Sequence, residues 1–154
     1  MRIVMILLVV ALTSCSVQPP ASTGQATAPP AAGGTVTVRL SNFAFDPEHL
    51  RLKAGTLVRL RFVNESDGGH DFSAPQFLAA SSFPPGSPAP VDGAVEVASH
   101  QTVEIALTPN VPGTYPFECT HLLHSSFGMN GTVEVIPQIP AVSGPSYHSA
   151  RSRS

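Results

Sequence analysis

Four residues with metal-binding side chains fall in two short segments of this 154-residue sequence. Cys119, His124 and Met129 follow one another at Cys-x4-His-x4-Met spacing, after one strand-like segment and before the next. His70 lies in a separate segment, which reads as a loop between two strands. A thiolate and two imidazoles, with a weak axial thioether, form the ligand set of a type 1 (blue) copper site. The four side chains therefore predict one copper ion per chain.

A further histidine in the same loop leaves the choice of the second imidazole ligand open. His121 lies between Cys119 and His124, so that the loop reads Cys-x-His-x2-His. The interval to Met129 favours His124, and we expect His121 to pack or hydrogen-bond beside the site; its alternatives are a ligand role or a second metal. Structural zinc is disfavoured, because it requires four strong ligands that usually include paired cysteines. The remaining histidines are expected at the surface: His49, His100 and His148.

The segments around these residues alternate apolar and polar positions, as half-buried β-strands do. In the first of them, Val36, Val38 and Leu40 alternate with polar or charged neighbours. Strands are expected at 35–40, 50–53, 57–63, 95–97, 102–107, 113–118 and 131–136, with a short helical turn at 75–82 in the long 74–93 connection. So many short strands within about one hundred residues predict an all-β fold, an antiparallel β-sandwich. Phe43 and Phe45, which follow the first strand, are expected to cap the sandwich.

Several motifs together resemble one known family. They are Phe-x-Phe-x-Pro, which ends at Pro47, the Ala-Gly-Thr-x-Val turn and strand at 54–58, Asn-x5-His, which ends at His70, and Gly-x-Tyr-x-Phe-x-Cys, which ends at Cys119. Across nearly all of 35–136 the sequence is similar to the cupredoxins, the plastocyanin/azurin superfamily of blue copper proteins. The resemblance implies an eight-stranded Greek-key sandwich with the copper at one end.

The resemblance also implies roles for individual residues. It implies these ligands: His70 as the isolated first imidazole, Cys119 as the thiolate, His124 as the second imidazole and Met129 as the axial thioether. Asp71 stands where the family often has a polar residue that braces the Cys loop, and Thr120 follows the Cys. We therefore predict a hydrogen bond between Asp71 and Thr120 as support for the ligands.

The predicted function is one-electron transfer by a single copper, with no enzymatic activity. The sequence has no paired carboxylates, no catalytic-triad order and no phosphate-binding glycine loop, and a copper oxidase would need further histidine-rich sites. The alternative is copper handling, that is storage, delivery or resistance, which the extra His121 and the long 74–93 connection keep open. The expected partners are redox proteins of unknown identity, and the protein is expected to be a monomer.

The N-terminal segment resembles a bacterial lipoprotein signal peptide. Arg2 precedes an apolar run at 3–12, which has about half the length needed to cross a bilayer. The sequence Leu-Thr-Ser-Cys then ends at Cys15 in the manner of a lipobox. We therefore expect residues 1–14 to be removed and Cys15 to carry lipid such as palmitate, which would anchor the protein to a membrane. The resemblance implies the bacterial periplasm, and Ser16 in place of Asp favours the outer membrane.

Composition separates the folded part from its tails and excludes one class of function. Segments 15–34 and 137–154 are rich in Pro, Ala, Gly and Ser, which predicts a flexible linker and a disordered tail around a domain at 35–136. Charged residues make up only 12% of the chain and the net charge is −2, which excludes a nucleic-acid-binding surface. Two cysteines cannot form a disulfide scaffold.

Overall fold

The computed structural model describes residues 32–87 and 90–139, which form a β-sandwich. The strands are β1 (Thr35–Ser41), β2 (Ala44–Asp46), β3 (His49–Lys53), β4 (Val58–Asn64), β5 (His70–Ser73), β6 (Ser81–Ser82), β7 (Ala94–Val97), β8 (Thr102–Pro109), β9 (Gly113–Glu118) and β10 (Asn130–Ile136). Two short helical segments are α1 (Pro75–Ala79) and η1 (Ser125–Phe127). Within these described ranges no helix has the length and apolar character needed to cross a membrane.

Several predictions concern segments that the structure does not describe. These segments are the signal peptide at 1–14, Cys15, the linker up to residue 31, and the tail from residue 140 onward, which includes His148. Within the described residues, the first strand begins at Thr35 and the last ends at Ile136.

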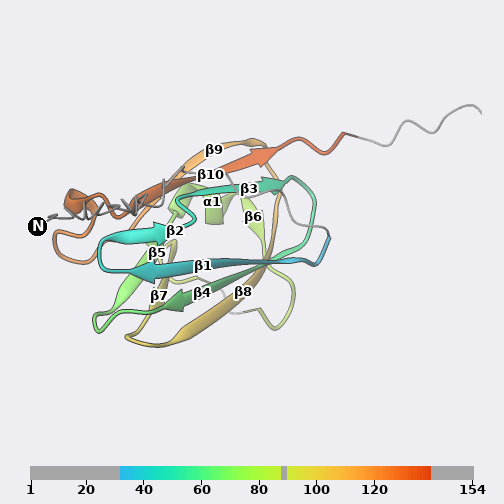
Figure 1. The fold of residues 1–154 in the computed structure, drawn as a ribbon. Helices are drawn as coiled ribbons and strands as arrows, with labels where there is room; N and C mark the ends of the chain where they lie inside the picture. The colour runs from blue at the N-terminus through green and yellow to red at the C-terminus, as the bar shows by residue number, and fades with distance from the viewer. Residues whose placement is uncertain (1–31, 88–89, 140–154) are drawn as a thin grey trace, which may run out of the picture.

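Two sheets of five strands make up the sandwich, and Figure 1 shows how these strands are arranged in space. One has the strand order β2-β1-β4-β8-β6, and the other has the order β3-β10-β9-β5-β7. The predicted all-β sandwich is confirmed. Each sheet contains one parallel pair, β1 with β4 and β10 with β3, among otherwise antiparallel neighbours. The sheets are therefore mixed, which the alternating pattern does not reveal because it reports which face is buried and not the direction of the neighbouring strand.

Three of the observed strands are absent from the sequence prediction. Strands β2 and β6 contain only three and two residues, which is too short for a periodic pattern. Strand β5 begins at His70, so the placement of this histidine in a loop was wrong. The first three residues of β5 are all buried, and no alternation marks the segment as a strand. The predicted helical turn at 75–82 is present as α1, which β6 follows.

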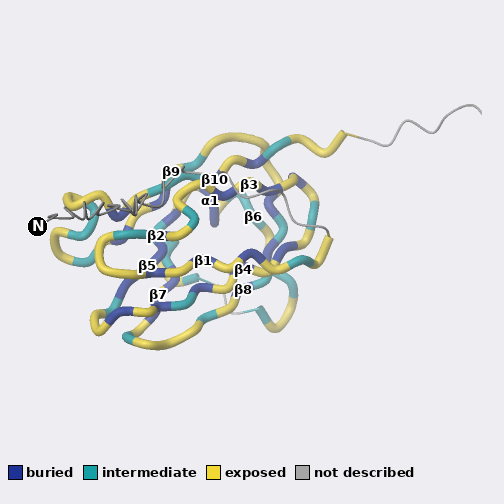
Figure 2. Tube along the Cα trace, in the orientation of Figure 1, coloured by how far each residue is buried: buried dark blue, intermediate teal, exposed yellow. Residues whose placement is uncertain are grey.

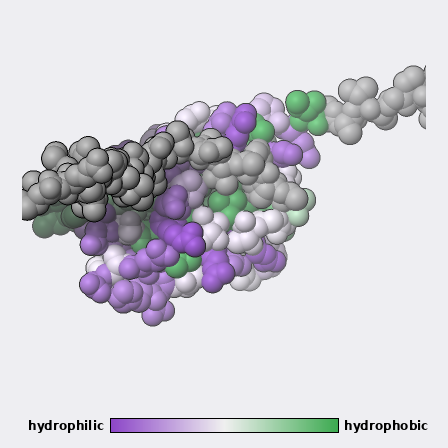
Figure 3. All heavy atoms as spheres, in the orientation of Figure 1, coloured by the Kyte–Doolittle hydropathy of each residue, from purple (hydrophilic) through white to green (hydrophobic). Residues whose placement is uncertain are grey.

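Alternation along the strands gives the first sheet one buried and one exposed face. Along β1 and the first part of β4, every second residue is buried (Figure 2). The exposed positions between them include Arg39, Arg59 and Arg61. The face of the molecule shown in Figure 3 is accordingly largely hydrophilic or neutral, with small hydrophobic spots.

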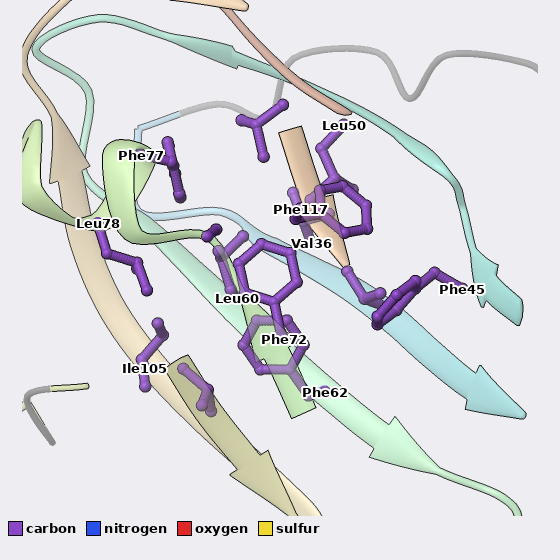
Figure 4. Close-up of a cluster of buried hydrophobic side chains, with 14 of the residues drawn as sticks. Val36, Phe45, Leu50, Leu60, Phe62, Phe72, Phe77, Leu78, Ile105 and Phe117 are labelled. Atoms are coloured by element: carbon purple, nitrogen blue, oxygen red, sulfur yellow. The ribbon is translucent and has the colours of Figure 1, made fainter. Parts of the chain in front are cut away.

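Aromatic side chains form the centre of the core between the two sheets (Figure 4). The ring centroid of Phe72 lies 4.9 Å from that of Phe62, 4.7 Å from that of Phe117 and 6.3 Å from that of Phe45. All four rings are 2% exposed or less. Since Phe72 lies two residues after His70 on β5, the packing of this ring also fixes the strand that carries the histidine.

Both ends of the described chain lie at one end of the sandwich. The Gly33 amide donates to the Leu57 carbonyl oxygen at 2.7 Å, and the Ala54 amide donates to the Ile136 carbonyl oxygen at 2.9 Å. Strands β1 and β4 run in parallel from this end, and β4 terminates at Asn64, on the way to His70 at the other end. The ends of the described chain are therefore separated from the start of β5, where His70 lies, by the length of the strands.

Candidate metal centre

The predicted metal ligands meet where strands of the second sheet end. Cys119 follows β9 directly, and Met129 comes just before β10, which is the antiparallel neighbour of β9. The loop between them, orange at the left of Figure 1, contains His124 immediately before η1. His70 is the first residue of β5, on the other side of β9. The sheet therefore brings His70 to the loop although it lies about fifty positions away in the sequence.

Three donor atoms converge at this point. The Nδ1 atoms of His70 and His124 are 3.1 Å apart, and the Sγ atom of Cys119 lies 3.3 Å from Nδ1 of His124 and 3.8 Å from Nδ1 of His70. A point at the centre of a triangle with these sides lies about 2.0 Å from each corner, close to typical metal distances of about 2.0–2.3 Å for nitrogen and sulfur. The geometry and chemistry of the three donors therefore fit one metal ion.

Met129 is tied to two of these residues through its backbone. Its carbonyl oxygen accepts a hydrogen bond from the Cys119 amide at 3.0 Å, and its own amide donates to the His124 carbonyl oxygen at 3.0 Å. The side chain is fully buried. Backbone hydrogen bonds within the loop thus hold Cys119, His124 and Met129 close together.

Burial sets the protonation of the two inner ligands. His70 is 1% exposed and Cys119 is 0% exposed. Burial lowers the pKa of His70; His124 and His121 act in the same direction, and Asp71 opposes them. Burial raises the pKa of the Cys119 thiol to about 11. In the metal-free protein at neutral pH the imidazole of His70 is therefore neutral and able to bind, whereas the thiol must lose its proton to become a ligand.

A chain of hydrogen bonds orients the His70 ring. Its Nε2 lies 2.7 Å from the Ser66 hydroxyl, which donates to Oδ1 of Asn64 at 2.8 Å, while the Asn64 side-chain amide donates to the Val97 carbonyl oxygen at 3.0 Å. The other two neighbours of the Ser66 hydroxyl, Oδ1 of Asn64 and the Gly68 carbonyl oxygen at 3.1 Å, can only accept, so the single serine proton serves one of them. We therefore assign Nε2 of His70 as the donor to Ser66, which leaves the Nδ1 lone pair for a metal. Asn64 appeared in the sequence only as the start of a motif, and Ser66 was missed because a serine in a Gly- and Asp-containing loop carries no signal of its own.

The predicted hydrogen bond between Asp71 and Thr120 is present. The Asp71 carboxylate accepts from the Thr120 amide at 2.6 Å and from its hydroxyl at 2.7 Å. Asp71 is 3% exposed, so β5 supports the Cys loop through a buried carboxylate.

Asp71→Ala is expected to destabilise the metal-free protein by about 1–3 kcal/mol, because two hydrogen bonds to a charged acceptor are lost. Urea unfolding followed by circular dichroism measures this change. Asp67→Ala is the matched control, since Asp67 is exposed and contacts the exposed His100, and it should leave the midpoint unchanged. Equal midpoints for wild type and Asp71→Ala would show that the hydrogen bonds do not hold the loop.

The other histidines fall into two groups. His121 lies outside the donor cluster, and its Nε2 is 2.9 Å from Oε1 of Glu96. His49 and His100 are exposed, as predicted, and contact Thr132 and Asp67 respectively.

The two aromatic residues expected to cap the sandwich differ in their surroundings. Phe45 is 2% exposed and lies in the core, whereas Phe43 is 43% exposed. The Phe43 ring packs edge-on against His124, with centroids 5.2 Å apart, and lies 5.1 Å from the ring of Phe127. Phe43 is thus part of the outer edge of the metal centre, a role that the Phe-x-Phe alternation alone could have suggested by placing one ring inside and one outside.

Comparison with known proteins agrees with this geometry. The cupredoxin-like domain family matches residues 4–135. Auracyanin-B of Chloroflexus aurantiacus is 32% identical over 123 residues, which cover 67% of this chain and 52% of that protein. The chain thus spans about half the length of this curated relative.

Solved structures show the same fold. A structure of auracyanin B matches with a TM-score of 0.53 at 27% identity, over 70% of this chain and 92% of that one. Dithionite-reduced auracyanin from Roseiflexus castenholzii matches with a TM-score of 0.54 at 24% identity, over 70% and 100% of the two chains. A multicopper oxidase from Campylobacter jejuni gives 0.52 at 13% identity, over 70% and 30%; these last two likenesses show the fold alone. The protein therefore belongs to the cupredoxin-like family, and its His, Cys, His and Met cluster provides one type 1 copper site per chain.

Proposed function

We propose that this protein carries single electrons through a copper ion bound by His70, Cys119, His124 and Met129. The observation that carries the proposal is the preformed triangle of two Nδ1 atoms and one Sγ atom, with sides of 3.1, 3.3 and 3.8 Å. Copper supplies the one-electron couple between Cu(II) and Cu(I) at such a site. The chain supplies ligands that are already in place, because backbone and side-chain hydrogen bonds fix the loop and the His70 ring. Little rearrangement then accompanies a change of charge.

We propose the edge of His124 as the route by which electrons enter and leave the site. His124 is less deeply buried than His70 and Cys119, and it lies at the edge of the site. The exposed Phe43 ring packs against His124 and against Phe127. Leu122, Leu123 and Phe127 are exposed apolar residues of the same loop. An apolar rim of this kind suits brief contact with a redox partner protein of unknown identity.

The ligand assignment is tested by replacing the two loop histidines in turn. His124→Ala is expected to remove the intense thiolate-to-copper absorption, since it deletes one of the three converging donors, whereas His121→Ala should keep the blue colour. Visible spectra after addition of one equivalent of Cu(II) to the purified protein decide the question. The opposite pattern would make His121 the ligand.

Copper handling is the second candidate function, and His121 is the observation that favours it. A third imidazole beside the cluster could serve as a transient ligand during uptake or delivery. The 74–93 connection gives this candidate less support, because its first part forms α1 and β6, and β6 pairs with β8 at the sheet edge. A colourless protein that binds Cu(I) tightly and passes it to an acceptor would favour copper handling over electron transfer.

We further propose that the protein is a monomer in the bacterial periplasm, anchored by lipid on Cys15, with the outer membrane as its destination. The lipobox-like sequence that ends at Cys15 and the serine that follows support this proposal. Labelling with a palmitate analogue and membrane fractionation test the anchor. Cys15→Ser should abolish labelling and release the protein, and labelling that persists in this variant would overturn the proposal.

A further inference from the structure

A third imidazole lies against the donor cluster without belonging to it. The ring of His121 is nearly parallel to that of His124, at 25° with centroids 5.8 Å apart, and its centroid lies 6.4 Å from that of His70. The His121 carbonyl oxygen also accepts a hydrogen bond from the His124 amide at 3.0 Å. His121 is thus coupled to His124 through both its ring and its backbone.

Glu96 on β7 holds the His121 ring in this position. Its Oε1 lies 2.9 Å from Nε2 of His121. Strands β5 and β7 place Glu96 directly opposite Asp71 in antiparallel register, so that two acidic residues are cross-strand neighbours, an arrangement that is unfavourable on its own. Each of them binds one of the two residues after the cysteine, Asp71 at Thr120 and Glu96 at His121. The two carboxylates therefore each hold one of two successive residues of the ligand loop.

Gly69 provides the space in which the His121 ring lies. A Cβ atom at Gly69 would lie 3.2 Å from Cε1 of His121 and 3.5 Å from Oε1 of Glu96, and the first distance is tighter than most real contacts. Any side chain just before His70 would therefore press against the ring. Three independent contacts, with Glu96, His124 and Gly69, determine where the ring lies.

We propose that Glu96 and His121 form a clasp that closes the metal centre on its β7 side. Glu96 acts as a positioning residue, because it holds the His121 ring against His124, and the ring blocks access of water and chelators to the cluster. This role for Glu96 and His121 depends on the proposed copper site. Glu96 and His121 are 65% and 34% exposed in their side chains, and such pairs add little to global stability. The clasp is therefore expected to slow the release of copper and to keep the loop between Cys119 and Met129 ordered, with little change in the free energy of unfolding.

Release of copper to excess EDTA, followed by loss of the blue absorption, tests the clasp. His121→Ala is expected to release copper faster by on the order of tenfold. His121→Phe keeps a ring over the site without the bond to Glu96, and Glu96→Gln keeps a hydrogen-bonding group without the charge, so both should fall between His121→Ala and wild type. His100→Ala is the matched control, because it removes an exposed histidine that pairs with a carboxylate at 3.0 Å; it should behave as wild type. Release from His121→Ala at the wild-type rate would overturn the proposal.

Hydrogen exchange on the metal-free protein separates this inference from the proposed function. The His124 amide, bonded to the His121 carbonyl, should exchange faster in Glu96→Ala than in wild type, whereas amides in the middle of β4 should not change. If wild-type protein failed to turn blue, the proposed function would fail, and the exchange rates would still decide whether the clasp exists. Equal exchange at His124 in the two proteins would mean that Glu96 does not hold the loop.

Discussion

Replacing Cys119 with alanine is expected to abolish copper binding at the cluster and the intense blue absorption with it. The thiolate is the one soft anionic donor among the converging atoms, and the absorption arises from charge transfer between sulfur and copper. Two imidazoles and a buried thioether would remain, which is too weak a set to hold Cu(II) against competing buffer ligands. Titration with Cu(II), followed by visible absorption and calorimetry, measures the loss.

Two further variants complete this test. Cys119→Ser keeps the size of the side chain but offers a poor donor oxygen, so it should also remain colourless. Cys15→Ser removes the other cysteine of the chain and should leave the colour intact. A blue band that survived in Cys119→Ala would exclude the type 1 assignment.

Phe72→Ala is expected to have the largest effect on stability, a loss of about 3–5 kcal/mol, because it removes a fully buried ring and leaves a cavity. This loss is a large part of the total stability of an ordinary domain, about 5–15 kcal/mol. The ring contacts three others at the centre of the core and lies on the strand that carries His70. Urea unfolding of the metal-free protein gives the change from the shift in midpoint.

Phe127→Ala is the matched control, since the Phe127 ring is 64% exposed and outside the core. Its midpoint should equal that of wild type, and a Phe72→Ala midpoint close to that of wild type would show that the cavity collapses. Copper should partly restore the stability of Phe72→Ala, because a ligand that binds only the folded state stabilises it. The same addition should do nothing for Cys119→Ala.

Much of the fold could be predicted from alternation alone. Strands with one buried and one exposed face, such as β1 and β8, appear in the sequence within one or two residues of their observed bounds. Strand β5 could not be found in this way, because both of its faces are covered where it passes the metal centre. The parallel pairing of β1 with β4 also could not be predicted from the sequence, since the pattern of buried residues does not depend on the direction of the neighbouring strand.

In the candidate site, too, some residues could be predicted from the sequence and others could not. Cys119, His124 and Met129 are close in sequence, so their spacing carries the information. His70 was included because the ligand set of a blue-copper site contains two imidazoles, and the resemblance to a family gave it the role of the isolated first ligand. The supporting contacts were harder to predict, because they depend on register across strands. The bond from Glu96 to His121 exists because β7 pairs with β5 in one particular alignment, and a shift by one residue would turn Glu96 to the other face. The hydrogen bonds that Thr120 donates to Asp71 could be predicted only because the family often has a polar residue at the position of Asp71.

The separation between the ends of the described chain and the metal centre has a practical consequence. Strand β1 has seven residues and starts at the far end, so its length alone gives about 20 Å between an attachment point there and the copper ligands. A shortened form that contains residues 32–139, fixed to an electrode or fused to another domain through Ala32 or Ile139, would present the metal centre outward. An affinity tag at either of these two residues would begin on the opposite side of the molecule from His70, so under the proposed function such immobilised forms should exchange electrons with soluble mediators as readily as the free shortened form.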